Sequence, residues 1–140
     1  MPPLDAGDDY FEHDADIGVI GRGSTVEGAF ASAARAMFAI QSAPESVRSL
    51  VAIQIDFEEG DLELALVRWL NALLCASRER GIALGEFGIG RDGDRWRGWA
   101  RGERWREGLE RGTEVKGATL TGLSVSREAG KCEVRCVVDV

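Results

Sequence analysis

Apolar residues recur with two different periods along the chain, and each change of period marks an expected element. Residues 16–20 alternate between apolar and polar, which predicts a strand that ends at the glycines of residues 21–23. Ser24 then predicts the start of a helix, because Glu27 follows three residues later as the partner in a capping box. The apolar stripe of this helix consists of Val26, Phe30, Ala33, Met37 and Ile40. The chain therefore opens with a strand followed by an amphipathic helix.

The strictest alternation in the chain lies at residues 47–57 and predicts a half-buried strand. Asp61 can cap a second helix, which we expect to continue to about Arg80. This helix is apolar on most sides, which is typical of a helix that packs against more than one neighbour. Its polar positions form one narrow strip, namely Arg68, Asn71, Cys75 and Arg78. We therefore expect this helix to be the central element of the fold.

The second half of the chain is rich in strand patterns. Asp92-Gly93 is a strong hairpin-turn signal between strands expected at residues 82–91 and 95–101. Two further strands are expected at residues 114–126 and 132–140. One face of the last strand is formed by Cys132, Val134, Cys136 and Val138.

The order of these elements predicts an α+β fold in which two main helices pack on mostly antiparallel sheets. Residues 1–140 are expected to form a single domain, with residues 1–9 as a flexible acidic leader. Apolar residues make up 44% of the chain and charged residues 29%, a composition that excludes disordered and collagen-like proteins.

The net charge limits the classes of partner that the chain can bind. The chain carries 17 basic and 24 acidic residues, for a net charge of −7 and a pI near 4.8. A protein that grips nucleic acid over its whole surface would be basic, so any contact with RNA is expected to be local or to go through a partner. No apolar run approaches the roughly 20 residues that span a bilayer, and the acidic start lacks the pattern of a signal peptide. We therefore expect a cytoplasmic protein with no membrane partner.

Acidic side chains at the two ends of the chain are the first candidates for a site. Asp14 and Asp16 fall on one face of the first strand, where two carboxylates need solvent or a hard cation between them. His13 lies beside them in the sequence and is either a ligand or a structural histidine. Asp139 leaves the apolar face of the last strand and is followed by Val140. A solvated leader and a frayed, exposed chain end are the competing interpretations.

Two further features could carry function. Lys116 is one of only two lysines among the basic residues, and it is either a functional cation or an ordinary surface lysine. Residues 91–111 hold seven arginines against five acids, interleaved with Trp96, Trp99 and Trp105. Such residues can form a platform for single-stranded nucleic acid, but tryptophans beside a hairpin also serve to cover a sheet. The chain contains no P-loop, dinucleotide fingerprint, nucleophile elbow or zinc-ligand spacing, so its motifs predict no enzyme.

Several segments together resemble the archease family. Residues 10–18, Tyr-Phe-Glu-His-Asp-Ala-Asp-Ile-Gly, are similar to its Glu-His-Thr-Ala-Asp-Ile-Gly opening, and residues 23–30 to the helix with an Ala-Phe pair that follows. The second helix, residues 61–74, resembles the family's Trp-Leu-rich helix. Residues 112–119, Gly-Thr-Glu-Val-Lys-Gly-Ala-Thr, and residues 137–140, Val-Val-Asp-Val, resemble its last segments. These matches follow one another in the family's order over most of the chain.

This resemblance implies an accessory protein of the RtcB-type RNA ligase rather than an enzyme. The protein would promote guanylylation and multiple turnover of the ligase in tRNA splicing or RNA repair, and would meet RNA only indirectly. By position, the family's metal site falls on Asp16, Asp139 and Val140, the last through its terminal carboxylate or main chain, with Asp14 and His13 as further candidates. The implied cofactor is a divalent cation, Ca²⁺ first, with Mg²⁺ or Mn²⁺ as alternatives. Lys116 would serve activation at the ligase interface.

The chain departs from the family pattern at two places, and other classes of function stay open. Asp14 stands where the family usually has Thr, and Leu120-Thr121 stands where a Tyr-His pair is common. A metal-dependent phosphoesterase that uses the same acids would turn over RNA or nucleotides without a partner. A chaperone-like binding module would bind its partner with or without metal.

Overall fold

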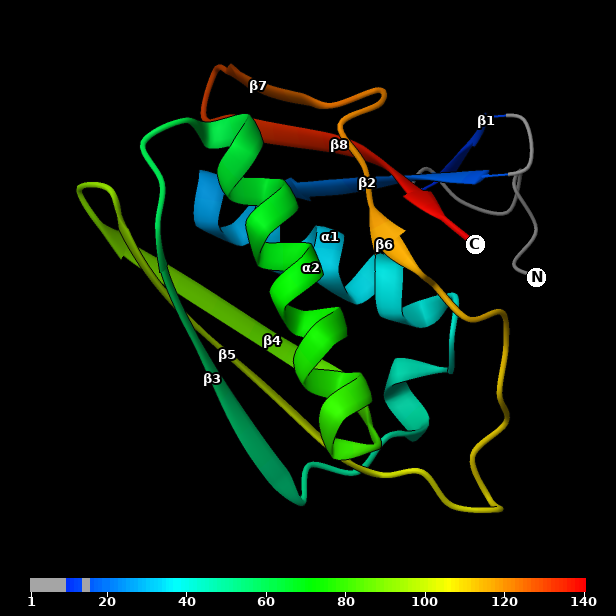
Figure 1. Ribbon diagram of the computed structural model, residues 1–140. Helices are drawn as coiled ribbons and strands as arrows, with labels where there is room; N and C mark the ends of the chain where they lie inside the picture. Colours follow the sequence, from blue (N-terminus) through cyan, green and yellow to red (C-terminus); the bar gives the residue numbers. More distant parts are fainter. Residues whose placement is uncertain (1–9, 14–15) are drawn as a thin grey trace.

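Two antiparallel sheets lie on either side of two long helices (Figure 1). The computed structural model describes residues 10–13 and 16–140, and for residues 11–13 it describes the backbone alone. The predicted leader at residues 1–9 and Asp14 therefore lie outside the described residues. The elements are β1 (Tyr10–His13), β2 (Asp16–Gly23), α1 (Val26–Ala39), the short 3-10 helix η1 (Pro44–Ser46), β3 (Val51–Glu58), α2 (Leu62–Arg80), β4 (Ile82–Asp92), β5 (Arg95–Arg104), β6 (Gly117–Ala118), β7 (Ser124–Glu128) and β8 (Lys131–Asp139).

The helices lie between the two sheets and contact both. The larger sheet has the strand order β1-β2-β8-β6, with β7 also paired to β8, and the smaller sheet has the order β3-β5-β4. Every pair between described strands is antiparallel. α1 contacts β2 and β8 on one side and β4 on the other, and α2 contacts β6 and β7 as well as all three strands of the smaller sheet. The predicted α+β fold is confirmed. The second helix packs against more than one neighbour as expected, but it is not the central element alone, because α1 packs more extensively against both sheets. Among the described residues, neither helix combines the length and the hydropathy needed to cross a membrane.

Aromatic side chains fill the core between these layers. Trp69 of α2 is fully buried and donates its indole N–H to the carbonyl oxygen of Phe30 in α1 at 3.0 Å. The Phe30 ring stacks on Trp96 of β5, with 4.9 Å between the ring centroids. Gly98 makes room for this arrangement, since a Cβ built there would lie 2.2 Å from Cζ3 of Trp69. Every position of the predicted apolar stripe of α1 is also buried.

The first strand and the first helix differ from their predicted bounds. β2 does not end at the glycines but includes them, because they let the strand pack directly against α1. A Cβ at Gly21 would lie 2.2 Å from the carbonyl oxygen of Ala29. The helix is capped by Thr25 rather than Ser24, since the Thr25 hydroxyl oxygen accepts a backbone N–H of the first turn at 2.9 Å. The predicted capping box between Ser24 and Glu27 is therefore wrong.

Two strand predictions also need correction, whereas the second helix does not. β3 begins at Val51 rather than at residue 47, because the preceding residues form η1 and a loop tied to β5. The single strand predicted for residues 114–126 is two short strands, β6 and β7, with Gly122 at a positive φ of 62° in the turn between them. The ends of α2 are as predicted: Asp61 accepts the Leu64 N–H at 2.9 Å, and Arg80 is the last helical residue.

Glu103 is a buried acid on the outer face of β5, held by two arginines. Arg106 donates from Nε to a carboxylate oxygen at 2.8 Å, and Arg48 donates from Nε at 3.0 Å and from its backbone N–H at 2.7 Å. These hydrogen bonds, first those of Arg106 and then those of Arg48, lower the pKa of Glu103 from 4.5 to about 2. The ionised carboxylate therefore ties the loop before β3 to the loop after β5.

Replacing Glu103 with glutamine is expected to lower the midpoint of thermal unfolding at neutral pH, because the amide loses charge-assisted hydrogen bonds. Since the folded pKa lies below the unfolded one, the stabilisation is fully present above pH 4.5 and is lost as the pH falls to about 2. The gap between wild type and Glu103→Gln should therefore close over this range in thermal melts. The control Glu58→Gln loses one exposed ion pair, with Arg95 at 3.2 Å, and should change the midpoint little. A gap that does not depend on pH would contradict this role of Glu103.

Candidate functional site

Asp16 and Asp139, which lie near opposite ends of the sequence, meet across two paired strands. Ile17 faces Val138 and Gly18 faces Val137 in the β2–β8 register, so one step further places Asp16 opposite Asp139. Facing residues of an antiparallel pair point their side chains to the same face of the sheet. Ile17 and Val138 are fully buried, whereas Asp139 is exposed and Asp16 half-buried. Both carboxylates therefore leave the core on the same side of the sheet. They belong to the start of β2 and the end of β8, and Figure 1 shows that β8 ends beside the C-terminus.

The other predicted metal ligands lie next to this pair in the backbone. His13 of β1 is the register partner of Asp16, although its side chain, like the whole of Asp14, lies outside the described part of the structure. Val140 follows Asp139, is half-buried and packs against the core. Its main-chain oxygens are thus held close to the Asp139 backbone.

Lys116 lies at the same end of the sheet. Its backbone N–H donates to the carbonyl oxygen of Asp139 at 2.7 Å, and the next residue, Gly117, is the register partner of Asp139. The Lys116 side chain is exposed. The structure therefore brings Asp16, Asp139 and Lys116 together from three separate parts of the sequence.

The chemistry of this group suits a hard cation with an open coordination sphere. Within the described residues, the two carboxylates and the Lys116 ammonium have no hydrogen-bond or ion-pair partner. Carboxylate and main-chain oxygens are the ligands that Ca²⁺ and Mg²⁺ prefer. The described residues contain no group of three His, Cys, Asp or Glu side chains that could enclose a metal. A cation held by Asp16, Asp139 and Val140 would therefore keep positions for water or for a partner's groups.

The polar strip of α2 has a role that the sequence pattern does not reveal. Asn71 and Arg78 do not simply face solvent but donate hydrogen bonds to backbone carbonyls of residues 115–118, the segment that carries Lys116. Helical periodicity identifies these positions as polar and contains no information about the distant segment that they bind.

Two of the three tryptophans of residues 91–111 lie on opposite faces of the smaller sheet, whereas Trp105 follows the end of β5, with the Arg111 guanidinium 4.0 Å from its ring centroid. Trp96 is buried and stacks between two phenylalanines, so it covers the sheet from inside the core. Trp99 lies on the outer face and is 38% exposed, with the Arg101 guanidinium 4.6 Å from its ring centroid. Arg101 also pairs with Glu86 at 3.6 Å. Glu58 offsets Arg95 of this face in the same way, whereas Arg97 has no ion pair among the described residues.

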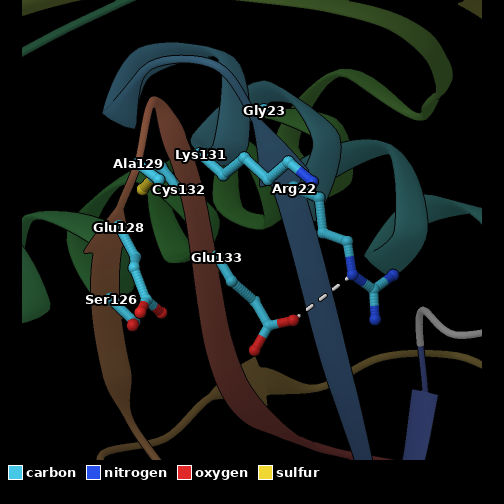
Figure 2. Close-up of a pocket in the computed structure, with 8 residues that line it drawn as sticks. All are labelled: Arg22, Gly23, Ser126, Glu128, Ala129, Lys131, Cys132 and Glu133. Carbon is cyan, nitrogen blue, oxygen red and sulfur yellow. Dashed lines mark hydrogen bonds and ion pairs between the residues drawn. The ribbon is translucent and has the colours of Figure 1, made fainter.

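A pocket of about 730 Å³ lies at the other end of the β2–β8 pair, lined by residues of β2, β7 and β8 (Figure 2). Arg22 and Glu133, which both line it, form an ion pair at 3.3 Å, and Lys131 and Glu128 add one charge of each sign. The Cys132 thiol at the pocket is buried, and burial raises its pKa, so it stays protonated and is a poor nucleophile at neutral pH. The charged residues that line this pocket therefore balance, and its thiol is unreactive at neutral pH.

Comparison with known proteins assigns the chain to a family. The sequence profile of the Archease protein family (MTH1598/TM1083) matches residues 9–140. The chain belongs to the archease family. The protein archease of Sulfolobus acidocaldarius is 34% identical over 135 residues, covering 94% of this chain and 97% of that protein. The protein archease of Pyrococcus furiosus is 35% identical over 124 residues, covering 85% of this chain and 87% of that protein. The family resemblance drawn from the sequence is confirmed.

Solved structures show the same archease architecture. The solution structure of Methanobacterium thermoautotrophicum protein 1598 superimposes with a TM-score of 0.77 at 27% identity, covering 94% of this chain and 97% of that one. The crystal structure of a Thermotoga maritima protein, described as an archease and possible chaperone, gives a TM-score of 0.66 at 22% identity, covering 93% and 94%. At that identity the second likeness supports the fold alone. The arrangement of two helices with antiparallel sheets is therefore the archease fold.

Proposed function

We propose that this archease-family chain is an activator of an RtcB-type RNA ligase. In this role it binds the ligase in the cytoplasm, promotes transfer of GMP to it and supports multiple turnover in tRNA splicing or RNA repair. The observation that supports the proposal is the meeting of Asp16, Asp139 and Lys116 at one end of the larger sheet. The resemblance to the family implies that these residues are metal ligands and the activating lysine, and they are exposed or half-buried, so a partner can reach them.

A divalent cation is part of this proposal. Asp16, Asp139 and the main-chain oxygens of Val140 would hold it, with Ca²⁺ as the first candidate and Mg²⁺ or Mn²⁺ as alternatives. When bound, such an ion offsets the repulsion between the facing carboxylates and adds positive charge where an anionic nucleotide approaches. Of the chain's own residues, the two aspartates supply oxygen donors from adjacent strands and fix the place of the ion relative to Lys116.

Lys116 supplies a positive charge on a fixed backbone. Its backbone N–H donates a hydrogen bond to the carbonyl oxygen of Asp139, so the position of its Cα is fixed relative to β8, which carries a proposed metal ligand. The ammonium is solvated in the isolated chain and is available to a phosphate or carboxylate of a partner. Charge placed next to a site of phosphoryl or nucleotidyl transfer stabilises the negative charge that develops there.

A guanylylation assay tests this function. A cognate RtcB-type ligase is mixed with labelled GTP, with and without the chain, and the transfer of GMP is followed in a single turnover. We expect the chain to raise the rate of transfer and, with RNA substrate in excess, the number of turnovers per ligase. Equal rates with and without the chain would contradict the proposal.

The same assay without ligase tests the phosphoesterase alternative. The chain is incubated alone with GTP or with RNA that ends in a cyclic phosphate, in the presence of Mg²⁺ or Mn²⁺, and no product is expected. Product that is formed by the wild type and is absent with Asp16→Ala would show that the chain is itself an enzyme.

A further inference from the structure

The segment that carries Lys116 has little secondary structure of its own. β6 has two residues, Gly117 and Ala118, and lies at the edge of the larger sheet, paired to β8. So short an edge strand contributes few ladder hydrogen bonds, and segments of this kind open readily in solution. Lys116 and Thr119, on either side of β6, also donate backbone hydrogen bonds to carbonyl oxygens of β8, and side chains from outside the sheet hold the same segment from α2.

Asn71 of α2 closes the free edge of β6. Its amide oxygen accepts the Ala118 N–H at 2.8 Å, and its amide nitrogen donates to the Ala118 carbonyl oxygen at 3.1 Å. This reciprocal pair has the pattern of two hydrogen-bonded residues in an antiparallel ladder. A half-buried side chain on a helix thus takes the place of a neighbouring strand.

Arg78, two turns further along α2, holds the residues just before β6. Its Nη2 donates to the carbonyl oxygen of Val115 at 2.9 Å and also to that of Lys116. From the other side, the Lys116 N–H donates to Asp139 at 2.7 Å, and the Val115 N–H donates to Oε1 of Gln41 at 2.9 Å. Both the N–H and the carbonyl of Lys116 are therefore engaged, one by the strand of Asp139 and one by α2.

We propose that Asn71 and Arg78 are positioning residues that set the place of Lys116 relative to Asp139 for activation of the ligase. This inference rests on the proposed function of Lys116. The ammonium stands at the end of a long exposed side chain, so the backbone must be fixed for that side chain to reach a defined point. Because a misplacement of about 1 Å can cost ~100-fold in rate, loosening the segment should lower activation even though Lys116 itself is unchanged.

The first test compares substitutions of polar residues on the same helix, α2. Arg78→Ala and Asn71→Ala are expected to lower the guanylylation rate at saturating concentrations of the chain by about tenfold. Arg68→Ala is the matched control, because Arg68 belongs to the same polar strip but pairs with Glu59 at 2.8 Å, and it should activate fully. Arg78→Lys keeps a charged donor and should recover part of the loss. Full activation by both Arg78→Ala and Asn71→Ala would overturn the inference.

Two measurements on the isolated chain separate positioning from a general effect on folding. Arg78→Ala and Asn71→Ala should melt within a few degrees of the Arg68→Ala control, because each removes only hydrogen bonds to one surface segment. In the isolated chain, Asn71→Ala should speed hydrogen exchange of the Ala118 amide by about tenfold, the change expected for loss of one hydrogen bond. A loss of activation that only follows a general loss of thermal stability, or unchanged exchange at Ala118, would overturn the inference.

The Lys116→Ala single variant shows which proposal has failed. If Lys116→Ala loses activation while Arg78→Ala and Asn71→Ala keep it, the positioning role is wrong and the proposed function stands. If Lys116→Ala keeps full activation, the proposed role of Lys116 is wrong and the positioning role falls with it.

Discussion

Replacing Lys116 with alanine is expected to return the rate of guanylylation to that of the ligase alone while leaving the fold intact. The side chain is exposed, so its removal should change the free energy of unfolding by no more than about 0.5 kcal/mol. A positioned group that stabilises developing negative charge is worth on the order of 100-fold in rate. Single-turnover transfer of GMP and thermal melts on the same preparations measure the two effects separately.

Lys131→Ala is the matched control for this variant. Lys131 is the second of the two lysines, is exposed, and begins β8, whereas Asp139, the partner of the Lys116 backbone, ends it. Lys131→Ala should therefore activate the ligase like the wild type. Lys116→Arg keeps a positive charge on a group of different shape, so it shows whether charge alone is enough for activation. If Lys116→Ala loses several degrees of thermal stability and still activates at low temperature, Lys116 is a structural residue.

Elements with local signals at their ends could be predicted from the sequence. Asp61 caps α2 with its own side chain, and Gly81 ends the helix in the left-handed conformation with a φ of 64°. The β4–β5 turn likewise uses Gly93 at a positive φ of 61°, although its two residues are Gly93 and Asp94 rather than the predicted Asp92-Gly93, because Asp92 still pairs with Arg95. In each case the residue that determines the geometry lies within the turn itself, so no distant contact is needed to recognise it.

Elements whose bounds depend on distant contacts were not predictable in the same way. The low strand propensity of glycine predicts that the strand ends at Gly21. β2 nevertheless continues through Gly21, because the backbone of α1 occupies the place that a side chain would take there. The strand predicted to begin at residue 47 begins only at Val51 for a similar reason. The Arg48 backbone N–H donates a hydrogen bond to the side chain of Glu103, which is distant in the sequence. Tertiary packing decided these bounds.

The candidate site shows the same division between residue type and placement. The alternation of each strand correctly puts Asp16 and Asp139 on the faces that leave the core, but alternation within one strand says nothing about which strand is its neighbour. The β2–β8 register supplies that information and turns two separate acids into a facing pair. Asn71 and Arg78 are a second example. The helical pattern identifies them as polar, but it does not indicate that they bind the backbone of residues 115–118.

A divalent cation is expected to stabilise the chain against thermal unfolding, and neutralising either aspartate is expected to remove that effect. Ca²⁺, Mg²⁺ and Mn²⁺ are titrated in turn, and an ion that binds the folded state stabilises it by about 2.7 kcal/mol at roughly 100 times its Kd. Asp16→Asn and Asp139→Asn each remove one of the two facing carboxylates, so each should lose most of the shift in melting temperature. The double variant should lose little more than either single one, because both residues act on the same ion.

In the presence of a chelator the effect of these substitutions should change sign. Like charges directly opposite each other on paired strands repel, so Asp16→Asn and Asp139→Asn should then melt at a higher temperature than the wild type. Asp92→Asn is the control, since it makes the same change of charge at the end of β4 in the smaller sheet and should keep the full cation-dependent shift. If Asp16→Asn and Asp139→Asn also keep that shift, or if their separate losses simply add in the double variant, Asp16 and Asp139 do not share an ion.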